Sequence, residues 1–276
     1  METISSVKPL LAVSVSLVAT IFIIAFRRSI NWREAWTFLA AFIKLAIILS
    51  MVPTILEGKK LVFKVVEILP NVGLAFRVDS FGLLFALVSS SLWIVTSAYS
   101  IGYMRGLKEH SQTRYFCFFA LALSATVGVA FAANLFTLYL FYEMLSFATY
   151  PLVTHHQDTE ARASGRKYLL YIVGTSVGLV LPAMLISYNL AGHLEFSRQG
   201  FLAGTGGETL MLVLLLMLVL GFAKVAIMPL HAWLPAAMVA PTPVSALLHA
   251  VAVVKVGAFS VFRVITGVFG TDLLTA

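Results

Sequence analysis

Long apolar runs recur along this 276-residue chain, and they restrict its fold more than any other feature. A helix needs about 20 apolar residues to cross a bilayer, and we place eight such spans. They cover residues 9–26, 35–56, 81–103, 115–133, 135–153, 168–190, 210–228 and 244–269. Only 11% of the residues are charged, against about 25% in soluble domains. The sequence therefore predicts an all-α polytopic membrane protein.

The segment KLVFKVVEILPNVGLAFRVD, residues 60–79, differs from the spans around it. It is rich in Val and Phe, its apolar and polar residues partly alternate, and Pro70 and Asn71 break it, which predicts a short β-hairpin outside the hydrocarbon.

The first span lacks a basic leader and a cleavage site, so we interpret it as a retained span. We divide the chain into residues 1–110, with helices one to three and the hairpin, and residues 111–276, with helices four to eight.

Basic residues gather in short loops, so the net charge of +7 does not indicate nucleic-acid binding. The loops after spans one, three and five hold nine of them: Arg27, Arg28, Arg33, Arg105, Lys108, Arg114, Arg162, Arg166 and Lys167. This excess of basic residues over the loops on the opposite side predicts that these loops lie inside and the N-terminus outside.

The single cysteine, Cys117, excludes an intrachain disulfide and a cysteine-ligated cluster. We find no dinucleotide or phosphate-loop motif, and we expect no bound cofactor or metal.

Three charged residues, Glu143, Lys224 and Lys255, lie inside apolar runs. A charge at the bilayer centre costs about 2.5–3.5 kcal/mol on insertion scales, and such residues usually face an ion path or each other. Lys224 is near the end of its span and could extend to the interface, whereas Lys255 is eleven residues into span eight. Glu143 could bond to the hydroxyls of Tyr142 and Ser146 as a structural carboxylate, or it could supply the counter-charge for a lysine.

Prolines interrupt the segment IMPLHAWLPAAMVAPTPVSALLHA that follows span seven. They are Pro229, Pro235, Pro241 and Pro243. Proline removes a backbone donor and breaks helices. Broken helices survive at membrane depth only where protein or a water-filled cavity satisfies the freed backbone, and transporters place ion sites there. The sequence therefore predicts a broken helix seven beside Lys224.

Four histidines give weaker signals. His249 lies six residues before Lys255, so the two project about 120° apart on a helix and could line one wet cavity; alternatively, His249 is a packing residue. We expect His231 to hold irregular backbone at the helix break. His155 and His156 follow span five, where we expect a solvated loop.

Lys44 is a further charge within a span, and it could either reach the interface or serve function. At the start of span three, Arg77 and Asp79 are expected to cap the helix. The Gly174 and Gly178 spacing in span six permits close helix packing.

The sequence GFAKVAIMPLHAWLPAAMVAPTPVSALLHAVAVVKVGAF resembles the signature of antiporter-like membrane subunits. These occur in respiratory complex I, in membrane-bound hydrogenases and in Mrp Na⁺/H⁺ antiporters. NLFTLYLFYEMLSFATYPL resembles the family's fifth-helix glutamate segment, and VDSFGLLF and YSIGYM resemble its third helix. The Pro-Thr-Pro-Val-Ser stretch and the single lysine of helix eight are most similar to the D-type Mrp subunit.

The resemblance implies a proton relay. Glu143 takes the place of the fifth-helix glutamate, Lys224 that of the lysine before the break, Lys255 that of the eighth-helix lysine, and His249 that of its histidine neighbour. It further implies proton or Na⁺/H⁺ translocation within a multisubunit complex of a prokaryotic inner membrane. The chain has no enzyme site of its own, but its complex could be an oxidoreductase linked to NADH, ferredoxin or hydrogenase.

Two departures from the family pattern stand out. Ala236 and Ala237 occupy the place after Trp-Leu-Pro where relatives often have an acidic residue. The eight spans also hold one copy of the five-helix repeat, whereas family members have two in about fourteen helices. We therefore expect the N-terminal half of such a subunit, with a partner chain supplying the second half-channel. Two alternatives remain: a structural or assembly subunit without an ion path, and a subunit of a redox-driven or bicarbonate-linked machine.

Overall fold

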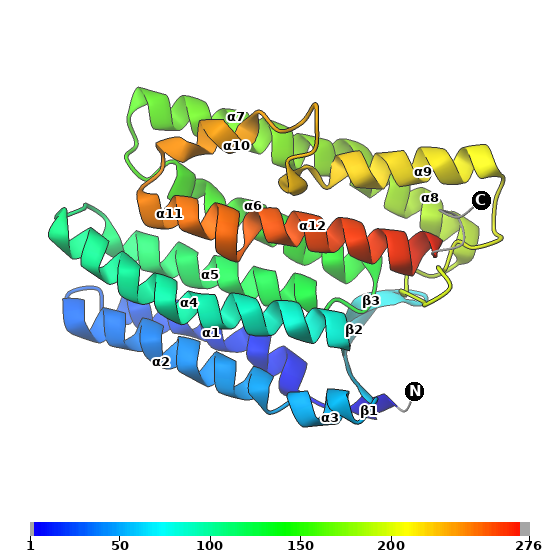
Figure 1. Cartoon of the computed structure of the whole chain (residues 1–276), viewed down its shortest axis with the longest axis horizontal. Helices are drawn as coiled ribbons and strands as arrows, with labels where there is room; N and C mark the ends of the chain where they lie inside the picture. The colour runs from blue at the N-terminus through cyan, green and yellow to red at the C-terminus, as the bar shows by residue number, and fades with distance from the viewer. Residues whose placement is uncertain (1–2, 271–276) are drawn as a thin grey trace.

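The computed structural model describes residues 3–270, in which long helices lie side by side with a small β-sheet at one end (Figure 1). The helices of the first two thirds are α1 (Lys8–Ala25), α2 (Ile30–Leu49), α3 (Val52–Leu56), α4 (Ser80–Gly106), α5 (Gln112–Ala130), α6 (Leu135–Val153), α7 (Thr159–Thr175) and α8 (Leu181–Ala191). The remainder are α9 (Glu208–Gly221), α10 (Trp233–Ala236), α11 (Thr242–Ala246) and α12 (Val253–Val264). Single π-turns join α7 to α8 and α11 to α12 and follow α12, at Ser176–Val180, Leu247–Val251 and Ile265–Phe269.

Six of these helical stretches are long and apolar enough to cross a membrane. They are Lys8–Ala25, Ile30–Leu56, Ser80–Gly106, Gln112–Ala130, Thr159–Ala191 and Thr242–Phe269. The eight predicted spans also included 135–153 and 210–228. Helix α6 has the predicted bounds, 135–153, but is less apolar than the six because it carries Glu143 and several hydroxyl side chains. Helix α9 is too short, with 14 residues, because the helix ends at Gly221. The membrane-spanning, mostly helical class is confirmed.

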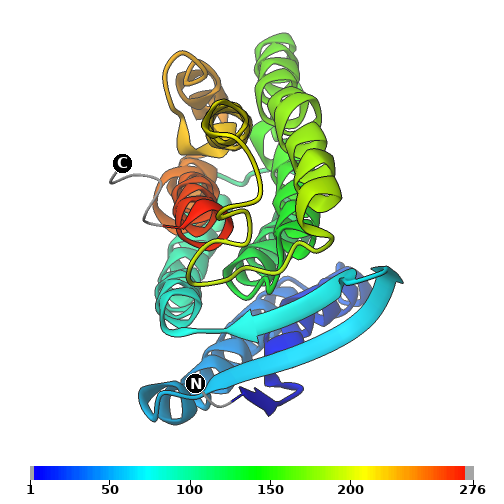
Figure 2. The same ribbon diagram turned by 90° about the vertical axis from the view of Figure 1, so that its right-hand side faces the viewer.

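The β-hairpin predicted for residues 60–79 is present. Strands β2 (Lys60–Leu69) and β3 (Val72–Val78) pair antiparallel, and β1 (Thr3–Ser5) adds a parallel third strand that the sequence analysis did not predict. Figure 2 shows the hairpin lying across one end of the bundle. The Arg77 amide donates to the Phe131 carbonyl at 2.7 Å, and the Ala133 amide donates to the Ala75 carbonyl at 3.0 Å. Strand β3 is thereby bonded to the α5–α6 connection.

Helix α5 lies at the centre of the bundle, and its side chains from Phe119 to Ala130 are almost all buried. The next helix begins at once: the Asn134 side chain accepts from the Thr137 amide at 2.7 Å and so caps α6. The tight α5–α6 hairpin therefore places α6, which carries Glu143, against the core. A Cβ atom added at Gly174 or Gly178 would instead meet nothing within 4 Å, so neither glycine marks a close approach of two helices.

Candidate functional site

The helix is interrupted where α9 ends at Gly221, eight residues before the first proline of the segment, Pro229. Residues Ala223–Val225 form one 3₁₀ turn, and Ala226 has a φ of 57°, a left-handed conformation that ends it. The indole Nε1 of Trp233 donates to the Ala223 carbonyl at 3.0 Å. A Trp side chain therefore satisfies the backbone at the break, whereas His231, which we expected to do so, is exposed.

Lys224 lies on this 3₁₀ turn and is fully buried, so it does not reach the interface. Its Nζ donates to the Tyr142 carbonyl at 2.6 Å and to the Ser146 hydroxyl at 2.7 Å. The same Nζ lies 3.2 Å from the centre of the Tyr142 ring, which can stabilise a cation. The Tyr142 hydroxyl accepts from the Lys224 amide at 3.0 Å. One turn of α6 thus holds both the charge and the backbone of the lysine.

Glu143 belongs to the same turn of α6 but makes no hydrogen bond. Both of its carboxylate oxygens are buried without a partner, and among the described residues 3–270 it forms no direct ion pair. It is nevertheless close enough to Lys224 for their charges to interact. Because an unpaired buried carboxylate is costly, this arrangement differs from a structural ion pair.

Helix α12 rests directly on the turn that carries Lys224. A Cβ atom added at Gly257 would lie 2.8 Å from the Cα of Val225, and it would come closer still to the Lys224 carbonyl carbon and the Val225 amide nitrogen. Only glycine permits this approach, because backbone atoms cannot move aside as a flexible side chain can. The position of the buried lysine is therefore coupled to the position of α12.

We expect Gly257→Ala to destabilise the protein by about 1–3 kcal/mol, the usual cost of overpacking a dense core. The matched control is Gly174→Ala, since an added Cβ there meets nothing within 4 Å. Thermal unfolding of the purified chain in detergent measures both. Equal melting temperatures for the two variants would show that α12 does not bear on the turn.

Lys255, two residues before Gly257, is exposed. It lies in an apolar groove of about 370 Å³ between α4 and α12, lined mainly by side chains such as Phe81, Leu84 and Val88. His249 is not among the residues that line this groove; its Nε2 lies 3.3 Å from the Met238 sulfur. This groove is therefore not the shared cavity that we expected for His249 and Lys255.

Lys44 is fully buried and, like Lys224, does not extend to the interface. Its Nζ donates to the Leu123 carbonyl at 3.0 Å and lies 5.0 Å from the centre of the Trp93 ring. On α4, the hydroxyls of Ser90 and Ser97 are buried without partners. Helices α2, α4 and α5 thus enclose the amine of a further buried lysine.

Sequence reasoning misplaced His155. The side chain is fully buried, although we expected a solvated loop. Burial, together with the nearby His110, Arg114 and His156, lowers the pKa of His155 to about 4. The side chain is therefore neutral near pH 7.

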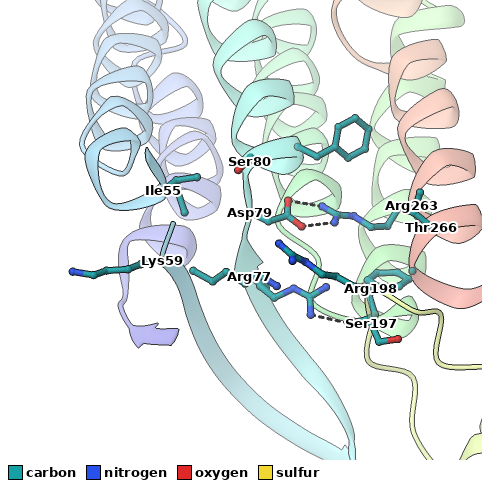
Figure 3. A pocket seen from close by; sticks show the side chains of 13 residues that line it. Ile55, Lys59, Arg77, Asp79, Ser80, Ser197, Arg198, Arg263 and Thr266 are labelled. Carbon is teal, nitrogen blue, oxygen red and sulfur yellow. Dashed lines mark hydrogen bonds and ion pairs between the residues drawn. The ribbon is translucent and has the colours of Figure 1, made fainter. Parts of the chain in front are cut away.

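A basic pocket of about 330 Å³ lies at the hairpin end (Figure 3). In it, Arg263 from α12 forms a two-pronged ion pair with Asp79, and the Asp79 carboxylate also accepts from the Gly82 amide at 2.8 Å. The predicted helix cap is thus present at Asp79, whereas Arg77 donates to the Phe196 carbonyl at 2.8 Å and does not cap. Although burial alone would raise the pKa of Asp79, the bonds and charge of Arg263 outweigh it and lower that pKa.

A sequence profile described as the transmembrane part of NADH:quinone oxidoreductase and Mrp antiporters matches residues 132–272, half of the chain. The chain belongs to this family. The match contains Glu143, Lys224 and Lys255, together with the broken helix between them. The protein is accordingly a multi-pass membrane subunit of the antiporter-like class, located in a prokaryotic plasma membrane.

Two curated relatives are subunit A1 of Na⁺/H⁺ antiporters. The protein of Staphylococcus haemolyticus (strain JCSC1435) is 33% identical over 222 residues, and that of Staphylococcus aureus (strain bovine RF122 / ET3-1) is 31% identical over 227 residues. Each match covers 78% of this chain but 27% of the relative, so the chain spans about a quarter of their length. Similarity to the D-type subunit in particular stays a prediction.

Two solved structures share the fold. A chain of the archaeal membrane-bound sulfane sulfur reductase superposes with a TM-score of 0.82 at 22% identity, covering 94% of this chain and 53% of that one. A chain of the Mrp complex from Dietzia sp. DQ12-45-1b gives a TM-score of 0.79 at 19% identity, covering 95% and 49%. Both belong to respiratory or antiporter membrane complexes.

Proposed function

We propose that this chain moves protons across the membrane as one subunit of a multisubunit cation/proton antiporter or redox-linked pump. The observation that carries the proposal is the buried Lys224, held by one turn of α6 at a helix break with the unpaired Glu143 beside it. Intramembrane ionisable groups at broken helices mark ion and proton paths. The family to which the chain belongs supports the same proposal.

In this proposal a proton passes between Glu143 and Lys224 and continues toward Lys255. When one group gains or loses a charge, its neighbour holds its own proton more or less tightly. Because α12 is seated on the lysine turn through Gly257, a shift of that turn also moves the helix that carries Lys255. His249 lies on the adjoining π-turn and is a secondary candidate for the same path.

The exposure of Lys255 supports a partner subunit. A lysine facing lipid in the middle of an apolar groove is costly, and a neighbouring polypeptide would cover it. We propose that the N-terminus lies outside, as the basic loops predict, and that H⁺, with or without Na⁺, is the transported ion. Relatives named Na⁺/H⁺ antiporter subunit A1 favour the antiporter form.

The test uses the native complex purified through this chain and reconstituted in vesicles that contain a pH-sensitive dye. We expect Lys255→Ala to reduce ion-driven or electron-driven proton movement about 100-fold, because a positioned proton-transfer group is lost. Lys167→Ala, which removes an exposed lysine on α7, is the control and should transport normally. Undiminished transport by a fully assembled Lys255→Ala complex would favour the scaffold alternative.

A further inference from the structure

Three of the chain's six histidines belong to the α4–α5 and α6–α7 connections, which lie at the end of the bundle away from the hairpin (Figure 1). His110 belongs to the α4–α5 connection, and His155 and His156 belong to the α6–α7 connection. Glu109 precedes His110 and completes the group. These loops lie more than forty residues apart in sequence, so only the fold brings the four side chains together.

The ligand atoms of Glu109, His110 and His156 all lie within 4.8 Å of one another, near the surface. Below them His155 is fully buried, and neither of its ring nitrogens has a partner at normal hydrogen-bond geometry. Its Nε2 lies 3.8 Å from the Glu109 carboxylate, and its ring stacks on that of His110 with centroids 4.8 Å apart. A buried, unpartnered imidazole is thus directed at the group.

The surrounding contacts fix both loops. The Arg114 guanidinium donates to the His155 carbonyl at 2.8 Å, which holds the α6–α7 connection against α5. The Gln112 side chain donates to the Glu109 carbonyl at 3.1 Å and to the Met104 carbonyl at 3.0 Å, which holds the α4–α5 connection. A site with restrained ligands binds an ion at a smaller entropic cost than a flexible one.

We propose that Glu109, His110 and His156 bind one divalent transition-metal ion, with Zn²⁺ as the best match, and that His155 positions Glu109. Two imidazoles and one carboxylate are a common protein ligand set for Zn²⁺, with a fourth position left for water. The ligand atoms need to close to about 3.3 Å from each other for bonds of about 2.0–2.1 Å in tetrahedral geometry, a change that surface side chains can make by rotation. His155 then donates to the free carboxylate oxygen, as outer-shell partners do.

The site is separate from the proposed proton path. Glu143 precedes His155 by twelve residues, which is about 18 Å along a helix. A bound ion would join the end of α6 to the α4–α5 connection, two segments that no covalent link joins directly. The proposal concerns binding alone and stands whether or not the chain moves protons.

The test titrates Zn²⁺ into the purified full-length chain by calorimetry, after removal of any histidine tag. We expect one ion per chain, and more than about a 100-fold weaker affinity for the double variant His110→Asn/His156→Asn, because losing two direct ligands costs more than losing an outer-shell partner. His155→Asn should weaken binding about 10–100-fold, the usual cost of losing an outer-shell partner. The control His231→Asn removes an exposed histidine elsewhere and should bind as the unaltered chain does. Equal affinity in the double variant and the control would overturn the proposal.

A second measurement needs no variant and therefore no assumption about folding. Zn²⁺ should protect His110 and His156 of the unaltered chain from carbethoxylation, followed by mass spectrometry of peptides, while the exposed His231 reacts as before. Equal modification of all three residues with and without saturating Zn²⁺ would contradict the site. Co²⁺ in place of Zn²⁺ should give the visible spectrum of a four-coordinate centre, and a six-coordinate spectrum would count against the ligand set.

Discussion

Lys224→Met should reduce proton movement by the reconstituted complex more than about 100-fold, the lower bound for a positioned proton-transfer group. Methionine keeps the length and apolar stem of lysine but cannot carry a proton. Lys224→Arg should be equally inactive, because a guanidinium keeps its proton at every working pH. The two substitutions therefore separate the need for a charge from the need for a group that titrates.

The measurement is the initial rate of dye-reported pH change, normalised to the amount of assembled complex. Glu143→Gln should show a comparable loss, since the amide fills the same space without accepting a proton. Lys167→Met is the matched control: it makes the same chemical change at an exposed position on α7. A Lys224→Met complex that retained more than half of the control rate would show that the buried lysine is structural.

Breaking the ion pair of Asp79 and Arg263 should cost about 3–5 kcal/mol of stability, the usual penalty when one partner of a buried pair is removed. The pair joins the start of α4 to the end of α12, and its side chains are only 20% and 8% exposed. Asp79→Asn is the sharper variant, because asparagine still caps a helix but leaves the arginine without a counter-charge. The double variant Asp79→Asn/Arg263→Gln should recover part of the loss.

The same pair predicts how stability depends on pH. Its lowered pKa in the folded protein means that Asp79 contributes stability above its unfolded pKa, about 3.9, and loses that contribution as pH falls through the lower, folded value. Melting temperatures of the detergent-solubilised chain between pH 3 and pH 8 measure this. The acid-side decline should be shallower in Asp79→Asn than in the unaltered chain. Parallel curves would mean that the pair does not contribute.

Local patterns were enough to predict much of this molecule. The proline-rich run predicted the broken helix, the Pro70–Asn71 pair predicted the hairpin, and Asp79 was correctly expected to cap α4. The depth of Lys44 was not predictable, because the direction of a long side chain depends on which helices surround it. The burial of His155 was missed for a similar reason: its neighbours come from a connection far away in sequence.

Periodicity did not determine two placements in the site. Lys255 lies in a groove on the exposed face of α12, and helical spacing alone does not say which face of a span meets a neighbour. His231 and Trp233 are two residues apart in an irregular segment, where helical spacing has no meaning. Only three-dimensional packing decides that the indole bonds to the break. The roles assigned to Glu143, Lys224, His249 and Lys255 stay predictions.

The bond between Trp233 and Ala223 also gives the molecule a built-in optical probe. The indole is fully buried, and it donates to the residue immediately before Lys224. The lysine turn cannot shift appreciably without stretching or releasing this bond, which changes the polarity that the indole senses. With Trp32, Trp36 and Trp93 replaced by phenylalanine, the emission of this one side chain would follow motion at the break in unlabelled protein.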